Sequence, residues 1–230
     1  MQTKKNEYIR NRFTVALGVA LFLQAMTSLI SGSLFLGPFT DKSDIEKILL
    51  STASNQTLAT VSVLLDIVTA LVIVCLGVLL YRLLRKVNHD CAMIALMLYV
   101  VEAGMLIVSK FFGYALIQLS GVYSATSDKE LGALGKILLQ MKDFSYNVHI
   151  IPFGIGAILF YSLLVKSKAI PTWLSLWGLI TVVPVLVGTF LKIFGVDIPF
   201  YIMLPYAPFE FFAGVFILIR GIPHKALDNM

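Results

Sequence analysis

The chain has 230 residues, of which 58% are hydrophobic and only 13% are charged, and its formal net charge is +5. Soluble domains carry about 25% charged residues, so this composition excludes an ordinary water-soluble fold. The hydrophobic residues form blocks of about 20, the length with which a helix crosses a membrane. A membrane β-barrel would instead show segments of about 10 residues with alternating polarity. The sequence therefore predicts an all-α, polytopic membrane protein that contacts the lipid bilayer.

Six hydrophobic segments follow one another along the chain, with no soluble domain between them. The expected spans are approximately residues 13–37, 58–81, 91–119, 145–165, 173–194 and 200–219. We expect six transmembrane helices packed in one bundle, so that residues 1–230 form a single transmembrane domain.

Two connections between the spans carry helical signals of their own. Ser43 and Glu46 have the spacing of a capping box, which satisfies the backbone at the start of a helix, and so predict a short helix there. In the polar connection 120–142, hydrophobic residues recur at helical spacing from Leu131 onwards. This one-sided stripe predicts an amphipathic helix at the membrane surface, separate from the fourth span.

The basic residues indicate how the bundle is oriented. Lys and Arg follow the second span, lie between the fourth and fifth spans, and flank both ends of the chain. Cytoplasmic segments of membrane proteins are enriched in these residues, so we expect both termini and the connections at Arg85 and Lys168 to be cytoplasmic. Because orientation explains the positive charge, no nucleic-acid partner is expected. Trp173 and Trp177 are expected to anchor the fifth span at the membrane surface.

Six ionisable residues fall inside the expected spans, where charge is costly and usually faces the interior of a bundle. They are Asp66, Glu102, Lys110, His149, Lys192 and Glu210. The second and third spans run in opposite directions, which brings Asp66 and Lys110 to a similar depth and predicts an ion pair. Glu102 and Glu210 fall near the midplane, where two neighbouring carboxyl groups away from water are not expected to be ionised together.

Two prolines stand just before Glu210 in the expected sixth span. A proline inside a helix frees the carbonyl four residues earlier, so Pro205 and Pro208 are expected to free the carbonyls of Tyr201 and Leu204. Freed carbonyls in hydrocarbon need a partner or a cavity, and interrupted helices beside carboxylates are typical of substrate sites in transporters. An ordinary proline kink is the alternative interpretation.

The expected ligand or proton site comprises Asp66, Glu102, Lys110, His149 and Glu210. We expect a non-enzymatic protein that transports or senses a small solute, with or without proton coupling, through a polar intramembrane cavity. Two alternatives stay open: an enzyme acting on lipid, with His149 and a carboxylate as acid and base, or an accessory subunit whose polar faces bind helices of a partner membrane protein. A buried structural ion pair between packing faces is the competing explanation. Motifs for metals, phosphates and nucleophiles are absent, so no metal, cofactor or catalytic residue is expected.

Segments spread over nearly the whole chain carry a family resemblance. They are residues 64–86 with Asp66, residues 99–103 with Glu102, residues 154–180 with the two tryptophans, and residues 210–221. They resemble the bacterial multi-pass membrane proteins of domain-of-unknown-function family 4386. The resemblance implies six spans and a bacterial cytoplasmic membrane, but no established activity. The chain departs from the family pattern at Tyr99 and Thr172, where arginine is common, which leaves Lys110 to substitute in any pairing with the third-span glutamate.

Overall fold

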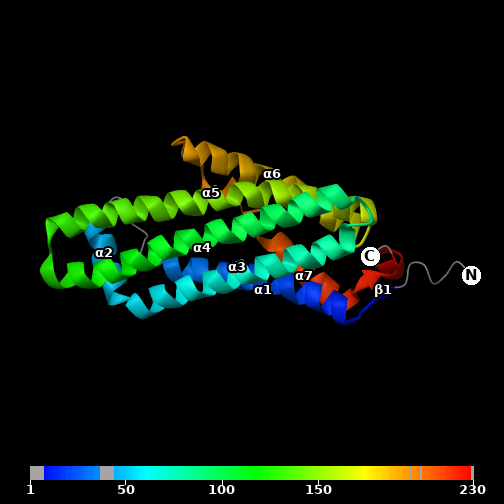
Figure 1. Ribbon diagram of the computed structural model, residues 1–230, viewed down its shortest axis with the longest axis horizontal. Helices are drawn as coiled ribbons and strands as arrows, with labels where there is room; N and C mark the ends of the chain where they lie inside the picture. Colours follow the sequence, from blue (N-terminus) through cyan, green and yellow to red (C-terminus); the bar gives the residue numbers. More distant parts are fainter. Residues whose placement is uncertain (1–7, 37–43, 197, 203, 229–230) are drawn as a thin grey trace, which may run out of the picture.

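The computed structural model is almost entirely helical (Figure 1) and describes residues 8–36, 44–196, 198–202 and 204–228. Its elements in chain order are β1 (Tyr8–Ile9), α1 (Arg12–Leu36), α2 (Ile45–Ser54), α3 (Gln56–Leu84), α4 (His89–Thr126), α5 (Lys129–Ser167), α6 (Thr172–Ile193), the 3-10 helix η2 (Phe200–Ile202), α7 (Ala207–Arg220), β2 (Ile222–Pro223) and α8 (His224–Asp228). The long helices lie side by side along one axis. This confirms the all-α fold class.

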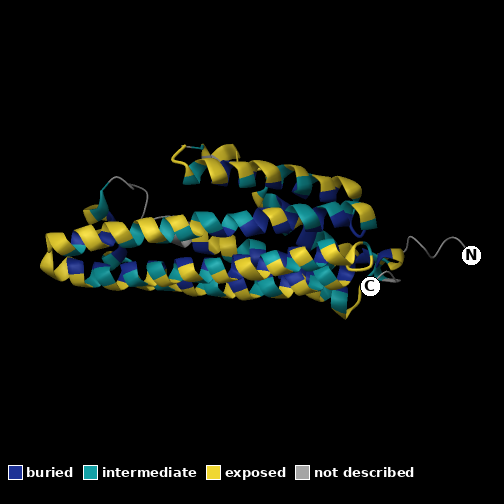
Figure 2. Ribbon diagram, turned by 45° about the horizontal axis from the view of Figure 1, so that its top comes forward, coloured by how far each residue is buried: buried dark blue, intermediate teal, exposed yellow. Residues whose placement is uncertain are grey.

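Five helices in the described ranges, α1, α3, α4, α5 and α6, are long and apolar enough to cross a membrane. Large hydrophobic side chains such as Leu71, Phe111 and Ile180 lie exposed on the outer faces of the long helices, which Figure 2 shows in yellow. Soluble monomers rarely expose extensive apolar surface, because water does not favour it. The outer surface therefore fits contact with lipid.

The sixth expected span does not form one continuous helix. Its first part is η2 and a turn, and α7 has only 14 residues. At about 1.5 Å per residue, α7 is about 21 Å long, which is shorter than the ~30 Å hydrocarbon layer. A sixth crossing is therefore not confirmed.

The expected surface helix before the fourth span is instead the first part of α5, which runs unbroken for 39 residues. Part of the expected stripe packs on α2 and α4, whereas Leu134 and Met141 are 45% and 43% exposed. The small core at this end comprises Ile48, Leu49, Leu116 and Tyr123, with Leu131 and Leu138 packed against it. The short helix α2 exists as expected, but it is capped by Asp44, whose carboxylate accepts hydrogen bonds from the backbone N–H groups of Glu46 and Lys47. Ser43 lies outside the described residues.

The two chain ends meet at the opposite end of the bundle. Strands β1 and β2 pair antiparallel, with Ile9 opposite Ile222 (Figure 1). We call this pairing of β1 with β2 the clasp. Gly221 has a φ of +80°, and a Cβ atom there would lie 2.2 Å from the carbonyl oxygen of Ile9, so the clasp requires glycine at this position. Gly18 and Gly214 let α1 and α7 approach closely, because a Cβ on Gly214 would lie 3.0 Å from the Gly18 carbonyl oxygen. These contacts hold α7 in the bundle.

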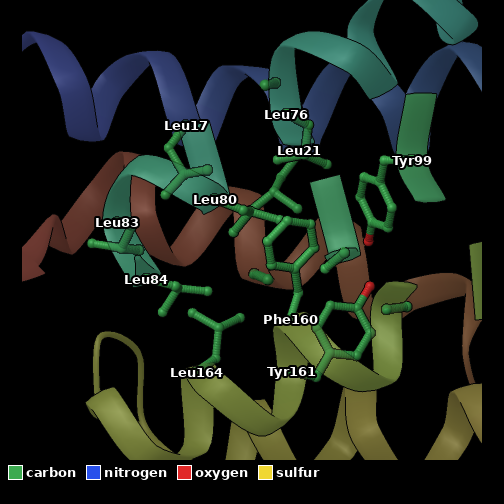
Figure 3. Packing of buried hydrophobic residues seen from close by; sticks show 14 of the residues in the cluster. Leu17, Leu21, Leu76, Leu80, Leu83, Leu84, Tyr99, Phe160, Tyr161 and Leu164 are labelled. Atoms are coloured by element: carbon green, nitrogen blue, oxygen red, sulfur yellow. The ribbon is translucent and has the colours of Figure 1, made fainter. Parts of the chain in front are cut away.

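The main core lies between the cavity described below and this clasp. Leucines of α1, α3 and α5 surround Phe160, and beside them Tyr99 and Tyr161 point their hydroxyl groups toward one another (Figure 3). Gly156 makes room for Tyr99, because a Cβ there would lie 2.9 Å from the tyrosine ring. The two tyrosines mark the boundary between the apolar core and the polar residues of the cavity.

Candidate functional site

A cavity of about 170 Å³ lies among the helices of the bundle. Four of the five expected site residues line it: Asp66 from α3, Glu102 from α4, His149 from α5 and Glu210 from α7. The fifth, Lys110, contacts Asp66. Residues distant in sequence thus converge on one space, whereas Lys192, in the last turn of α6, does not line it.

The predicted ion pair between Asp66 and Lys110 is confirmed. The Lys110 Nζ lies 2.5 Å from Asp66 Oδ2, and the two side chains are only 12% and 13% exposed. The ammonium group also lies 5.0 Å from the centre of the Tyr146 ring, where the aromatic face attracts a cation. The α3–α4 hairpin brings the residues together, and their charges cancel at this end of the cavity.

Glu210 occupies a different place from the one expected. It lies in the first turn of α7, because the helix begins at Ala207 and Pro208 falls at its start, where a proline needs no hydrogen-bonded N–H. The two prolines therefore start the helix and do not interrupt it. The carbonyl that needs a partner is that of Pro205, which accepts a 2.9 Å hydrogen bond from the indole N–H of Trp177.

Three donors surround the Glu210 carboxylate. Its Oε1 accepts a hydrogen bond of 2.6 Å from the Tyr206 hydroxyl, and lies 3.3 Å from both the Tyr161 hydroxyl and Gln24 Nε2. The hydroxyls of Tyr161 and Tyr206 are 2.7 Å apart. Because Tyr161 has one proton to donate, its shorter contact with Tyr206 dominates. The N-terminus of α7 adds partial positive charge, so Glu210 sits in a site built for a negative group.

Glu102 and Gln24 present oxygen atoms without partners. Glu102 is 3% exposed and Gln24 is 5% exposed. No residue in the described ranges donates a hydrogen bond to Glu102 Oε2 or to Gln24 Oε1, and both residues line the cavity. We call these two oxygens the open acceptors. Since buried polar atoms are normally hydrogen-bonded, the open acceptors leave hydrogen-bonding capacity unused in two residues of the cavity lining.

His149 also lines the cavity. Its Nδ1 contacts the carbonyl oxygen of Tyr146, and the two rings lie 4.7 Å apart. The carbonyl accepts the Nδ1 proton, which leaves Nε2 as the acceptor of the neutral ring. His149 shares the cavity with Asp66.

Three residues at the Glu210 carboxylate, Gln24, Tyr161 and Tyr206, were not expected from the sequence. Gln24 carries the one signal that could have found it, since it is the only amide side chain in the first hydrophobic segment. The tyrosines gave no such signal, because a tyrosine in a hydrophobic helix usually packs or lies at the interface. Over the described part of the chain, no group of three or more His, Cys, Asp or Glu residues is placed to hold a metal ion.

The fold and the site define a class: an all-helical, membrane-type protein with an acidic cavity inside the bundle. The model of one family, "Domain of unknown function (DUF4386)", matches residues 16–221. The chain belongs to this family, as its resemblance predicted, and the match includes every residue that lines the cavity. Comparisons with curated proteins and with solved structures gave no match.

Proposed function

We propose that the protein transports or senses a small solute, which binds in the cavity and exchanges with a carboxyl proton. The observation that carries the proposal is the convergence of three acidic residues and a histidine, from four helices, on one interior cavity. Ionisable residues inside membrane bundles are costly and typically belong to solute or proton pathways.

The volume of the cavity supports a binding role over simple packing. A space of about 170 Å³ is large enough for a small solute or several water molecules, and its polar walls let either occupy it. Asp66, Glu102, His149 and Glu210 all line this one space, which favours a cavity function over the binding of a partner's helices.

The unequal surroundings of the two glutamates support a single proton shared between them. Glu210 is the better anion, because hydrogen bonds from Tyr206 and Gln24 stabilise its charge. Glu102 is buried, carries an open acceptor and shares the cavity with Glu210. A carboxyl group in that position keeps its proton until a cation or water can compensate the charge. The proton on Glu102 is the one that solute binding would release.

Infrared difference spectroscopy between pH 5 and 9 tests this proposal. We expect a protonated-carboxyl band in the wild type that disappears in Glu102→Gln. Glu130→Gln, which makes the same change at an exposed position in the first turn of α5, is the matched control and should keep the band. If neither Glu102→Gln nor Glu210→Gln removes a band, the proton-site proposal fails.

The same proposal includes the topology and location. The chain would cross a bacterial plasma membrane six times with both termini in the cytoplasm, and α7 with the segment before it would complete the last crossing. The β1–β2 pairing supports this arrangement, because it joins the two chain ends on one side, and so do the basic connections at Arg85 and Lys168. In a cysteine-free background, a cysteine at position 168 should resist an impermeant thiol reagent added outside; labelling there would contradict the orientation.

A further inference from the structure

We infer that the cavity binds a small organic ammonium ion, whose N–H groups donate to Glu102 and Gln24. The inference rests on the proposed function and adds the chemical class of the solute.

Among the described residues that line the cavity, the buried polar side-chain atoms without a partner are both acceptors; the unpartnered Tyr99 hydroxyl, which can donate, is not in the lining. The Gln24 amide donates its N–H to Glu210, which turns its oxygen away from that bond and into the role of an open acceptor. Glu102 Oε2 is the second open acceptor. A carboxylate, an ether or a ketone would bring further acceptors and leave these oxygens unsatisfied, whereas an ammonium group brings three donors.

The charges of the residues that line the cavity also favour a positively charged solute. Asp66 on α3 is compensated by Lys110 on α4, so the lysine is already engaged and the pair adds little net charge. Glu102 and Glu210 contribute the remaining charge. The other titratable groups in the lining are His149 and Tyr146 on α5 and Tyr206 at the start of α7, and α1 and α6 contribute Gln24 and Val185. The balance is negative, which favours a cation over an anion.

The size of the cavity and its aromatic lining narrow the chemical class of the solute further. A cavity of about 150 Å³ holds a benzene molecule, so the present one, at about 170 Å³, accommodates an organic ion of similar size. Tyr146, Phe153 and Tyr206 supply aromatic walls, which attract organic cations. When the ammonium ion binds, the O–H bond of Glu102 breaks, its proton passes to water, and the carboxylate accepts an N–H group. The net charge of the cavity is unchanged by this exchange.

Three ions of similar size test the inference by thermal shift and calorimetry on the detergent-solubilised full chain. Tert-butylammonium has the charge and the donors, tetramethylammonium has the charge without donors, and pivalate has the opposite charge. We expect tert-butylammonium to bind at least 10-fold more tightly than the other two. Glu102→Gln and Gln24→Leu should each weaken its binding at least 10-fold, while Glu130→Gln should leave it unchanged.

Each other result overturns the inference. If tetramethylammonium bound as tightly as tert-butylammonium, the N–H donors would not contribute to recognition. If pivalate bound more tightly than tert-butylammonium, the cavity would prefer an anion. Binding of none of the three, in a protein that keeps its Glu102-dependent infrared band, would reject the ammonium class and leave the proposed function standing. Should Glu102→Gln fail to fold, the ion series on the wild type and on Gln24→Leu decides the question.

Discussion

The cavity has two acidic ends, one at Asp66 and one at Glu102, and each holds a carboxyl group in an apolar interior. The two carboxyl groups differ in whether a partner compensates them. Asp66 has a lysine 2.5 Å away, whereas Glu102 carries an open acceptor although it is more deeply buried. A buried charge that is fully paired contributes to structure, and breaking such a pair is costly. A buried carboxyl with unused capacity contributes little to folding. The comparison assigns a structural role to the first end and, in our proposal, a binding role to the second.

The largest effect should follow from breaking the pair at the structural end. Asp66→Asn or Lys110→Met leaves one uncompensated charge, and each should destabilise the protein by about 3–5 kcal/mol. The double substitution should recover part of this loss because no isolated charge remains. Thermal unfolding in detergent measures all three variants. Simple additivity of the two losses would show that the residues do not interact.

A smaller loss is expected from the donors around Glu210. Tyr206→Phe removes the 2.6 Å hydrogen bond to the carboxylate and should destabilise by about 1.5–3 kcal/mol, as for bonds to charged groups. Tyr161→Phe removes contacts of 2.7 Å to Tyr206 and 3.3 Å to Glu210, and should cost only about 1 kcal/mol. The same unfolding assay ranks the two variants, and the reverse order would contradict the assignment of Tyr206 as the main donor.

The packing of α6 on α7 should stabilise the end of the cavity that holds Glu210, and not the end that holds Asp66. A Cβ added to Gly178 would lie 2.4 Å from the ring of Phe209, the residue before Glu210, so Gly178→Ala should destabilise by about 1–3 kcal/mol. Gly104→Ala is the matched control, because nothing lies within 4 Å of its Cβ position, and it should be neutral or slightly stabilising. Equal unfolding temperatures for the two variants would contradict this packing.

The smallest effect on stability is expected at Glu102. Glutamine has the same shape as a glutamic acid that keeps its proton, so Glu102→Gln exchanges one neutral side chain for another and should change the unfolding free energy by less than about 1 kcal/mol. This contrasts directly with Asp66→Asn, which makes the same chemical change at the paired end. A loss for Glu102→Gln as large as that for Asp66→Asn would remove the distinction between the two ends.

The depth of a residue along a regular helix could be predicted from the sequence, whereas contacts between residues distant in sequence could not. Counting residues from the span ends brought Asp66 level with Lys110, and the structure pairs them. The same counting put Glu210 mid-helix, which was wrong because α7 starts at Ala207, where tertiary contacts such as the Trp177–Pro205 hydrogen bond fix the turn. Local periodicity contains no information about such contacts between distant residues.

The contacts of Gln24 and Tyr161 with Glu210 could not be predicted for the same reason. Each side chain acquires its function from the Glu210 carboxylate, which lies 186 residues away from Gln24 in sequence and 49 from Tyr161. The helical spacing that begins at Leu131 was correct, but Leu131 and Leu138 pack on the small core formed with α2 and α4, whereas Leu134 and Met141 are exposed. Helical faces could be predicted, and what they face could not.

The most direct test of the central claim is an infrared difference spectrum recorded on adding tert-butylammonium to the wild-type protein at constant pH. If the cation replaces a proton on Glu102, the protonated-carboxyl band should decrease as the cation binds, and Glu102→Gln should show no such change. Asp66→Asn, if it remains folded, should still show the decrease, because that end carries no exchangeable proton in this account. Binding of the cation with the band unchanged would contradict the exchange and with it the binding role of the Glu102 end.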